Sequence, residues 1–184
     1  MKLYLVRHGE SEANVAGVIN DDPAQSINLT PRGRRQAETA AERLRGELSS
    51  DVFTQAYASE FPRARQTAEI LLAGLGLTLP LVVDTRLNER HSGLNGKPVE
   101  AFNGMVCPDP VNIKPADGES FREQMNRLRG FIDELARRHP HATVLAVSHE
   151  NPIMAAAALS GRDPEDAARS GLGNCEWIIL DWLS

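Results

Sequence analysis

The 184-residue sequence predicts an α/β fold, a three-layer sandwich with a mostly parallel central sheet covered by helices on both faces. The first observation is that short hydrophobic runs alternate along the chain with segments of helical periodicity, as in βαβ units. The second is that the runs at 3–6 and 143–147 are continuously apolar, which is typical of strands buried on both faces of a parallel sheet. No repeat or linker interrupts the alternation, so we expect a single domain over residues 1–184.

Five strands are expected where apolar runs are bounded by polar residues, glycine or proline. They fall at residues 3–6, 51–58, 79–83, 143–147 and 177–182. The first long helix is expected to begin after Thr30 as N-cap, with Pro31 in its first position. Ser59 is the expected N-cap of the second. The expected helices span residues 31–49, 60–74, about 99–105, 120–138, 152–159 and 164–169.

Two segments show little periodicity. Residues 14–29 are mixed polar with glycine, asparagine and proline, and we expect a loop over the ligand crevice. Residues 85–119 are also rich in glycine, proline and asparagine. Because long irregular segments in compact domains usually serve function, this one is predicted to be a lid or a substrate-selecting insertion.

Composition narrows the class of protein. The net charge of −5 argues against a general nucleic-acid or membrane-surface binder, although a local arginine cluster could still bind an anionic substrate. Cys107 and Cys175 form no metal or redox spacing, and no carboxylate cluster indicates a catalytic metal, so neither metal nor cofactor is expected. With no signal peptide or membrane span apparent, the expected location is cytoplasmic. The oligomeric state stays open, a homodimer being one alternative.

Basic residues follow two of the predicted strands. Arg7 and His8 come directly after the first strand and His149 after the fourth, so both histidines should meet at the carboxyl edge of the sheet. Arg63 lies at the start of a helix, beside backbone N–H groups that favour an anion. Glu89 begins the irregular segment. Such a group suits phosphoryl transfer: arginines neutralise phosphate oxygens, a histidine nitrogen attacks, and a carboxylic acid protonates the leaving oxygen.

These residues resemble the histidine phosphatase superfamily, which includes cofactor-dependent phosphoglycerate mutases and many small phosphatases. The matching segments, in the family's order, are 5–11, 14, 28–37, 59–68, 89 and 147–149. The resemblance implies that His8 is the phosphorylated nucleophile and Glu89 the proton donor. It also implies that Arg7, Arg63 and His149 bind the phosphoryl group, helped by Asn14. Arg90 lies in a stretch similar to that of the mutases and is expected to bind substrate.

One position departs from the family pattern. Glu150 stands where the family commonly has glycine after the second histidine, which places a carboxylate beside the predicted phosphate pocket. In the acid-phosphatase branch an acidic residue near this position donates the proton, so Glu150 is a second candidate acid. It could instead bind substrate and adjust selectivity, or simply be a carboxylate favoured by the helix dipole.

The leading functional hypothesis is a metal-independent phosphomonoesterase that hydrolyses a small phosphorylated metabolite through phosphohistidine on His8. A phosphoglycerate mutase is the alternative, although Ser92 stands where mutases usually carry tyrosine. A non-catalytic phosphate-binding module is a third, and the retention of every catalytic residue speaks against it. The segment from Arg90 to Glu119 is expected to determine which substrate is taken.

Overall fold

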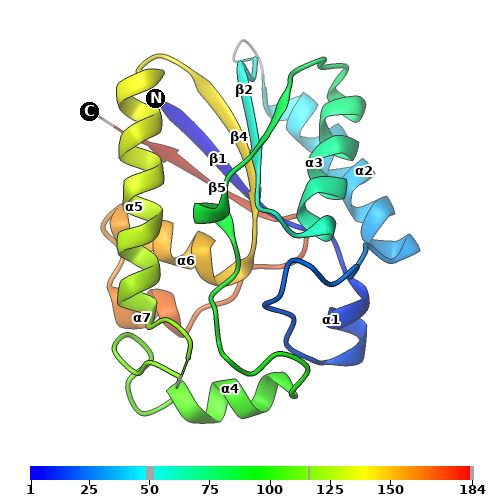
Figure 1. Ribbon diagram of the computed structural model, residues 1–184. Helices are drawn as coiled ribbons and strands as arrows, with labels where there is room; N and C mark the ends of the chain where they lie inside the picture. Colours follow the sequence, from blue (N-terminus) through cyan, green and yellow to red (C-terminus); the bar gives the residue numbers. More distant parts are fainter. Residues whose placement is uncertain (49–51, 116, 183–184) are drawn as a thin grey trace.

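The computed structural model describes residues 1–48, 52–115 and 117–182 as a central sheet with helices on both faces (Figure 1). In these residues the sheet has five strands in the order β3-β2-β4-β1-β5. Four of them run parallel, and β5 pairs antiparallel with β1 at one edge. The strands are β1 (Lys2–Arg7), β2 (Gln55–Ala58), β3 (Leu81–Val83), β4 (Thr143–Ser148) and β5 (Trp177–Asp181). The predicted α/β sandwich with a mostly parallel sheet is therefore confirmed.

The helices form a layer on each side of this sheet and a cover beyond the carboxyl ends of its central strands. Helices α2 and α3 lie on one side, α5, α6 and α7 on the other, and α1 and α4 beyond the strand ends (Figure 1). They are α1 (Glu12–Ala16), α2 (Pro31–Glu47), α3 (Pro62–Leu75), α4 (Val99–Val106), α5 (Phe121–Arg138), α6 (Glu150–Leu159) and α7 (Pro164–Ala168), with a 3-10 turn at Thr85–Leu87. No helix in the described stretches combines the length and apolar character that a membrane span needs.

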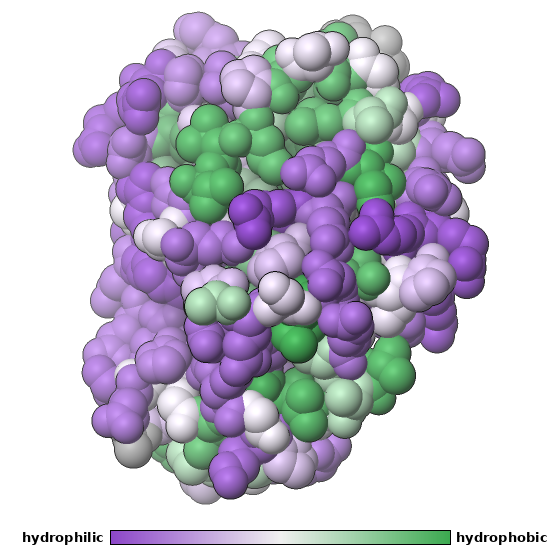
Figure 2. Space-filling view, turned by 45° about the vertical axis from the view of Figure 1, so that its right-hand side comes forward, coloured by the Kyte–Doolittle hydropathy of each residue, from purple (hydrophilic) through white to green (hydrophobic). Residues whose placement is uncertain are grey.

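The core follows from the two-residue period of the buried strands. In β1, Leu3 and Leu5 face the layer of α5 and α6, whereas Tyr4 and Val6 face α2 and α3. Because both faces are covered, the first strand has to be apolar throughout, as its sequence predicts. The surface shown in Figure 2 is mostly hydrophilic, with hydrophobic side chains gathered in its upper part and in smaller groups below.

Two strands are shorter than predicted. The run at 51–58 forms a strand only from Gln55, residue 51 lying outside the described part, and the run at 79–83 only from Leu81. Phe53 is buried, but it packs edge-on against Tyr4 with ring centroids 5.1 Å apart and does not join the sheet. A hydrophobic run indicates burial, and burial does not require strand pairing.

Three helix starts also differ from the prediction. Ser59 is not the N-cap of α3, which begins after Phe61 without a side-chain cap. The first residues of the expected loop at 14–29 belong to α1, whose capping box joins Ser11 and Asn14 and which is capped by Gly17 with a φ of 65°. Helix α6 begins at Glu150, two residues earlier than expected. The expected end of α2 at residue 49 lies outside the described residues.

The loop after β1 is held against the start of α2 by two glycines. A Cβ atom on Gly33 would lie 2.0 Å from the carbonyl oxygen of Glu10, and one on Gly9 would lie 2.4 Å from the carbonyl oxygen of Gly33. Only residues without a side chain permit this approach. The two glycines therefore fix the backbone that immediately follows His8.

Candidate active site

Two histidines lie side by side at the carboxyl ends of the central strands. The parallel register of β1 and β4 sets Arg7 opposite Ser148, so His8 and His149 leave the sheet as neighbours. Their ring centroids are 5.0 Å apart, and both side chains are buried. The sequence prediction that these residues meet at one edge of the sheet is confirmed by this geometry.

Arg63, from the first turn of α3, joins the two imidazoles. Its Nε donates to Nε2 of His8 at 3.1 Å, and Nη2 contacts Nδ1 of His149 at 3.3 Å. The guanidinium also donates to Asn20, through Nη1 to the side-chain oxygen and through Nη2 to the backbone carbonyl at 3.1 Å. Asn20 was missed by the sequence analysis, because nothing in its loop marks it as a partner of a residue 43 positions away.

The hydrogen bonds assign a neutral tautomer to His8. Its Nδ1 lies 2.7 Å from the carbonyl oxygen of Gly9, which only accepts, so Nδ1 carries the proton. The Nε2 atom then has a free electron pair, toward which Arg63 donates. Burial and, next, the positive charge of Arg63 hold the pKa of His8 well below its usual value. His8 is therefore a neutral base or nucleophile in this site.

His149 carries its proton on the other ring nitrogen, Nε2. Its Nδ1 faces the Arg63 guanidinium, which only donates, so Nε2 carries the proton and donates to Oγ of Ser59 at 2.8 Å. Burial and the charge of Arg63 lower the pKa of His149 well below its usual value. Ser59, predicted as a helix cap, instead fixes the orientation of this imidazole.

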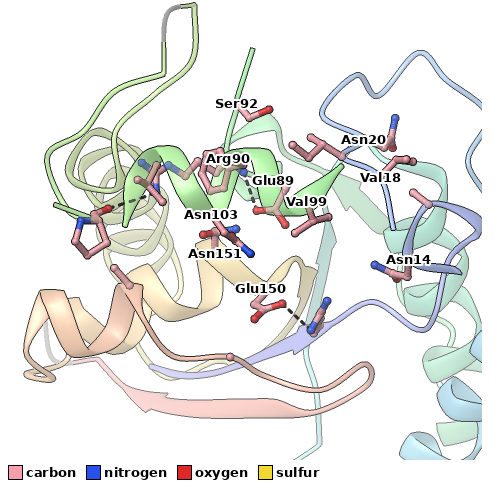
Figure 3. A pocket seen from close by; sticks show the side chains of 18 of the residues that line it. Asn14, Val18, Asn20, Glu89, Arg90, Ser92, Val99, Asn103, Glu150 and Asn151 are labelled. Atoms are coloured by element: carbon pink, nitrogen blue, oxygen red, sulfur yellow. Dashed lines mark hydrogen bonds and ion pairs between the residues drawn. The ribbon is translucent and has the colours of Figure 1, made fainter. Parts of the chain in front are cut away.

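Arg7 and Glu150 form an ion pair at the mouth of the site. Nη1 of Arg7 lies 2.7 Å from Oε2 of Glu150, the ion pair marked by the dashed line at Glu150 in Figure 3. The same atom also donates to the carbonyl of Leu172. The side chains keep 17% and 33% of their surface exposed, so the pair borders solvent. Glu150 therefore lies beside the predicted phosphate site and forms an ion pair with Arg7, one of the two arginines expected to bind phosphate.

Glu89 lies on the other side of the same space (Figure 3). Its Oε1 accepts the backbone N–H of Arg90 at 2.8 Å. Burial raises the pKa of Glu89, against the lowering effects of the Arg90 N–H hydrogen bond and of the Arg63 charge, and the negative charge of Glu150 adds a smaller raising effect. A raised pKa favours the protonated carboxylic acid, the form that a proton donor needs.

Asn14 and Arg90 differ in what they can offer a ligand. The side-chain oxygen of Asn14 accepts from the backbone N–H and the hydroxyl of Ser11, each at 3.0 Å, which leaves the amide nitrogen at the cavity (Figure 3). Arg90 instead donates to three backbone carbonyls, those of Glu119, Ile113 and Pro110. Its guanidinium therefore holds the irregular segment together, and its role in substrate binding stays a prediction.

These side chains border a cavity of about 660 Å³. Its polar lining comprises Arg7, His8, Ser11, Asn14, Asn20, Arg63, Glu89, Arg90, Ser92, Asn103, Cys107, Glu150, Asn151, Arg169 and Ser170. Its other lining residues are Ala13, Val18, Ile19, Val99, Phe102, Val106, Pro110, Ala168 and Gly171. The cavity brings together every residue of the predicted site except His149, which lies behind Arg63 and the His8 ring. Among the described residues no group of three His, Cys, Asp or Glu side chains could hold a metal ion.

Comparisons with known proteins agree with this geometry. The family model of the histidine phosphatase superfamily (branch 1) matches residues 3–184. The adenosylcobalamin/alpha-ribazole phosphatase of Salmonella typhimurium is 32% identical over 96% of this chain and 92% of its own. A 2,3-bisphosphoglycerate-dependent phosphoglycerate mutase of Bartonella quintana is 33% identical over 89% of this chain and 84% of its own. The mycobacterial glucosyl-3-phosphoglycerate phosphatase in complex with VO3 superimposes with a TM-score of 0.81 at 28% identity, covering 98% and 92% of the two chains.

Proposed function

We propose that this chain, which belongs to branch 1 of the histidine phosphatase superfamily, hydrolyses the monoester of a small phosphorylated metabolite through a phosphohistidine on His8. The enzyme class, a histidine phosphatase, rests on the family and on the phosphatases among its relatives. The observation that carries the finer proposal is the state of His8: a buried, neutral imidazole whose Nε2 electron pair faces Arg63 beside the cavity.

In the first step, the phosphoryl oxygens are bound by the guanidinium groups of Arg7 and Arg63. The proton stays on Nδ1 of His8, hydrogen-bonded to the carbonyl of Gly9, while Nε2 attacks phosphorus in line. The bond between phosphorus and the ester oxygen breaks, and that oxygen takes the proton of Glu89. The products are the free alcohol and a phosphorylated His8.

In the second step, the carboxylate of Glu89 accepts a proton from water as the water oxygen attacks phosphorus. The bond between phosphorus and Nε2 breaks, which releases inorganic phosphate and restores both His8 and the protonated Glu89. His149 lies behind these groups: its Nδ1 accepts from Arg63 and its Nε2–H donates to Ser59, so it orients the Arg63 guanidinium beside the phosphate site. No step in this scheme uses a metal ion.

A phosphoglycerate mutase remains the second candidate, because a mutase of Bartonella quintana is as similar in sequence as the phosphatases are. The two activities differ in the fate of phosphorylated His8. A phosphatase lets water reach it, whereas a mutase protects it until the phosphoryl group returns to a substrate. Phosphate release that is faster than phosphoglycerate interconversion would favour the phosphatase.

The experiment combines turnover with trapping of the intermediate. We expect release of phosphate from p-nitrophenyl phosphate, unchanged by a chelator, and an acid-labile, alkali-stable label on the quenched protein. His8→Ala should abolish both. His141→Ala is the matched control, because His141 is exposed and precedes β4, near the amino end of that strand and away from the site at its carboxyl end. Full activity in the His8→Ala protein would overturn the proposal.

A further inference from the structure

We infer that the leaving-group side of this cavity selects phosphate monoesters of uncharged, apolar, ring-sized alcohols and rejects substrates that carry a second anionic group. The inference deepens the proposed function and rests on it, since the phosphoryl group is placed at His8. Two features carry it: an apolar slot between α4 and the segment after α1, and a charge distribution that leaves a second anion without a partner.

The slot has two apolar walls. Helix α4 contributes Val99, Phe102 and Val106, which recur at the spacing of one helical face. The second wall, next to it, is formed by Ala13, Val18 and Ile19. In the lower part of Figure 2, hydrophobic side chains interrupt the hydrophilic surface in the region of α1 and α4. An apolar group that enters between these walls is removed from water, which favours its binding.

The two walls are fixed to each other through their backbones. The N–H of Ile19 donates to the carbonyl of Lys97 at 2.8 Å, and the N–H of Gly96 donates back to Ile19 at 2.8 Å. The N–H of Val99 donates to the carbonyl of Gly17 at 3.1 Å, so the start of α4 is tied to the end of α1. The segment expected to be a lid is therefore anchored at this point, and the slot between the walls is already formed.

The cations of the cavity are already engaged by the chain itself. Arg90 donates to three backbone carbonyls and lies over the Phe102 ring, 5.0 Å from its centroid. Arg169 is paired with Glu165 at 2.8 Å. Arg7 and Arg63, the remaining arginines of the lining, are the ones that hold the phosphoryl group. A second anion would therefore have to break contacts made within the protein.

Glu150 adds a repulsive element. Its carboxylate lies at the cavity beside Arg7, across the space from Glu89 (Figure 3). A carboxylate or second phosphate on the alcohol would meet this charge without a free cation to offset it, and repulsion of this kind is an effective source of specificity. The uncharged polar groups of the lining include the amides of Asn103 and Asn151, which can bond an uncharged hydroxyl or ring nitrogen (Figure 3).

The size of the cavity agrees with such a ligand. At about 660 Å³ it falls within the range of sites that enclose small organic molecules, far larger than phosphate alone requires. The alcohol that the structure fits is therefore an apolar ring or a short branched chain with one or two uncharged polar atoms. Phosphoglycerates, with their carboxylate, do not fit this description.

A native cysteine permits a binding test that needs no turnover. Cys107 is exposed and lines the cavity, whereas Cys175 is buried, and its burial raises the thiol pKa to about 12. N-ethylmaleimide should therefore modify Cys107 alone, as intact mass and a Cys107→Ser variant would verify. The ligands are benzylphosphonate and 3-phosphonopropionate, whose phosphorus–carbon bonds cannot be hydrolysed, with methylphosphonate as the reference for the phosphate site.

We expect benzylphosphonate to half-protect Cys107 at a concentration about tenfold or more below that of 3-phosphonopropionate, as burial of a ring predicts. Glu150→Gln should reduce this ratio of concentrations, because 3-phosphonopropionate, which carries the carboxylate, should bind the variant more tightly. Val99→Thr keeps the side-chain shape but adds a hydroxyl, and it should weaken benzylphosphonate several-fold without affecting methylphosphonate. Val15→Thr is the control, because Val15 is exposed on α1 and lies outside the cavity lining.

Equal protection by the two ligands, stronger protection by 3-phosphonopropionate, or no protection by either would overturn the inference. Its failure is distinguishable from that of the proposed function. Hydrolysis of phenyl phosphate without the difference in protection would leave the phosphatase chemistry standing and remove the selectivity. The difference in protection without any hydrolysis would support the slot and overturn the chemistry.

Discussion

Replacing Glu89 by glutamine removes proton transfer by this side chain, both to the leaving oxygen and from the attacking water, and keeps its shape and its hydrogen bond to the backbone. Oε1 of Glu89 already accepts the N–H of Arg90 at 2.8 Å, so the amide oxygen of glutamine can keep that bond. The other position then carries an NH₂ group, which can donate a hydrogen bond to the ester oxygen but cannot transfer a proton. Position and shape are retained, and the loss is limited to proton transfer.

The expected loss depends on the leaving group. General acid catalysis contributes about a hundredfold to ten-thousandfold, or about 2.7 to 5.4 kcal/mol of barrier, when the leaving oxygen has to be protonated. An alkyl phosphate should therefore lose that much in kcat/KM with Glu89→Gln, because kcat/KM reports the phosphorylation of His8 and not the later attack of water. p-Nitrophenolate departs without a proton near neutral pH, so its ester should lose tenfold or less. The assay is phosphate release from both esters, compared between the wild type and the variant.

Glu150→Gln is the matched variant, because it replaces the other carboxylate at the same cavity. It should change KM and substrate preference without dependence on the leaving group. The negative charge of Glu150 contributes to the raised pKa of Glu89, so its removal lowers that pKa. The alkaline limb of kcat for the alkyl ester should then move to lower pH. If Glu150→Gln shows the leaving-group-dependent collapse and Glu89→Gln does not, the assignment of the acid is refuted.

Further predictions concern stability. His8 and His149 have lowered pKa values when folded, so the unfolded chain binds more protons and stability is lost as pH falls through about 6.5. Each neutral histidine can account for up to about 1.4 kcal/mol of unfolding free energy between pH 7.5 and 5.5. Urea titrations of the wild type and of His8→Asn at both pH values would measure this difference. The same pH dependence of stability in both proteins would contradict the prediction. Gly33→Ala should destabilise the protein by about 1–3 kcal/mol, because its Cβ would lie 2.0 Å from the Glu10 carbonyl. A Cβ atom on Gly46, in the same helix, would have no atom within 4 Å, so Gly46→Ala should be neutral or mildly stabilising. Urea titrations of the two glycine variants would compare their stabilities.

The sequence predicted the parts of the site that follow from strand burial. β1 and β4 are apolar on both faces, and this pattern alone places them in the centre of the sheet. The residues that follow such strands must lie at one edge, which brings His8 and His149 together without any knowledge of side-chain contacts. The same reasoning was weaker for β2 and β3, where buried residues such as Phe53 contribute to the core without pairing.

The sequence could not predict the side chains that hold the site in place. Asn20 and Ser59 bond Arg63 and His149 across 43 and 90 positions, and such distant pairs leave no local pattern. Helix α1 has five residues, too few for a hydrophobic period, although the Ser11–Asn14 capping box is a local signal that could have marked its start. Arg90 shows the converse case: a family motif indicates a ligand contact, but the fold commits its guanidinium to the backbone of its own segment.

The guanidinium of Arg7 can bind a phosphoryl oxygen of the substrate and the carboxylate of Glu150 at the same time. Nη1 bonds both Glu150 and the carbonyl of Leu172, whereas Nη2 has no hydrogen-bond partner in the part of the chain that the structure describes. A phosphoryl oxygen can therefore bind at Nη2 while the ion pair with Glu150 persists. The carboxylate of Glu150 then stays beside the occupied site, where it both raises the pKa of Glu89 and repels a second anion. In Glu150→Gln the alkaline limb of kcat should therefore move to lower pH and the discrimination between the phosphonates should narrow, and one effect without the other would show that substrate separates the ion pair.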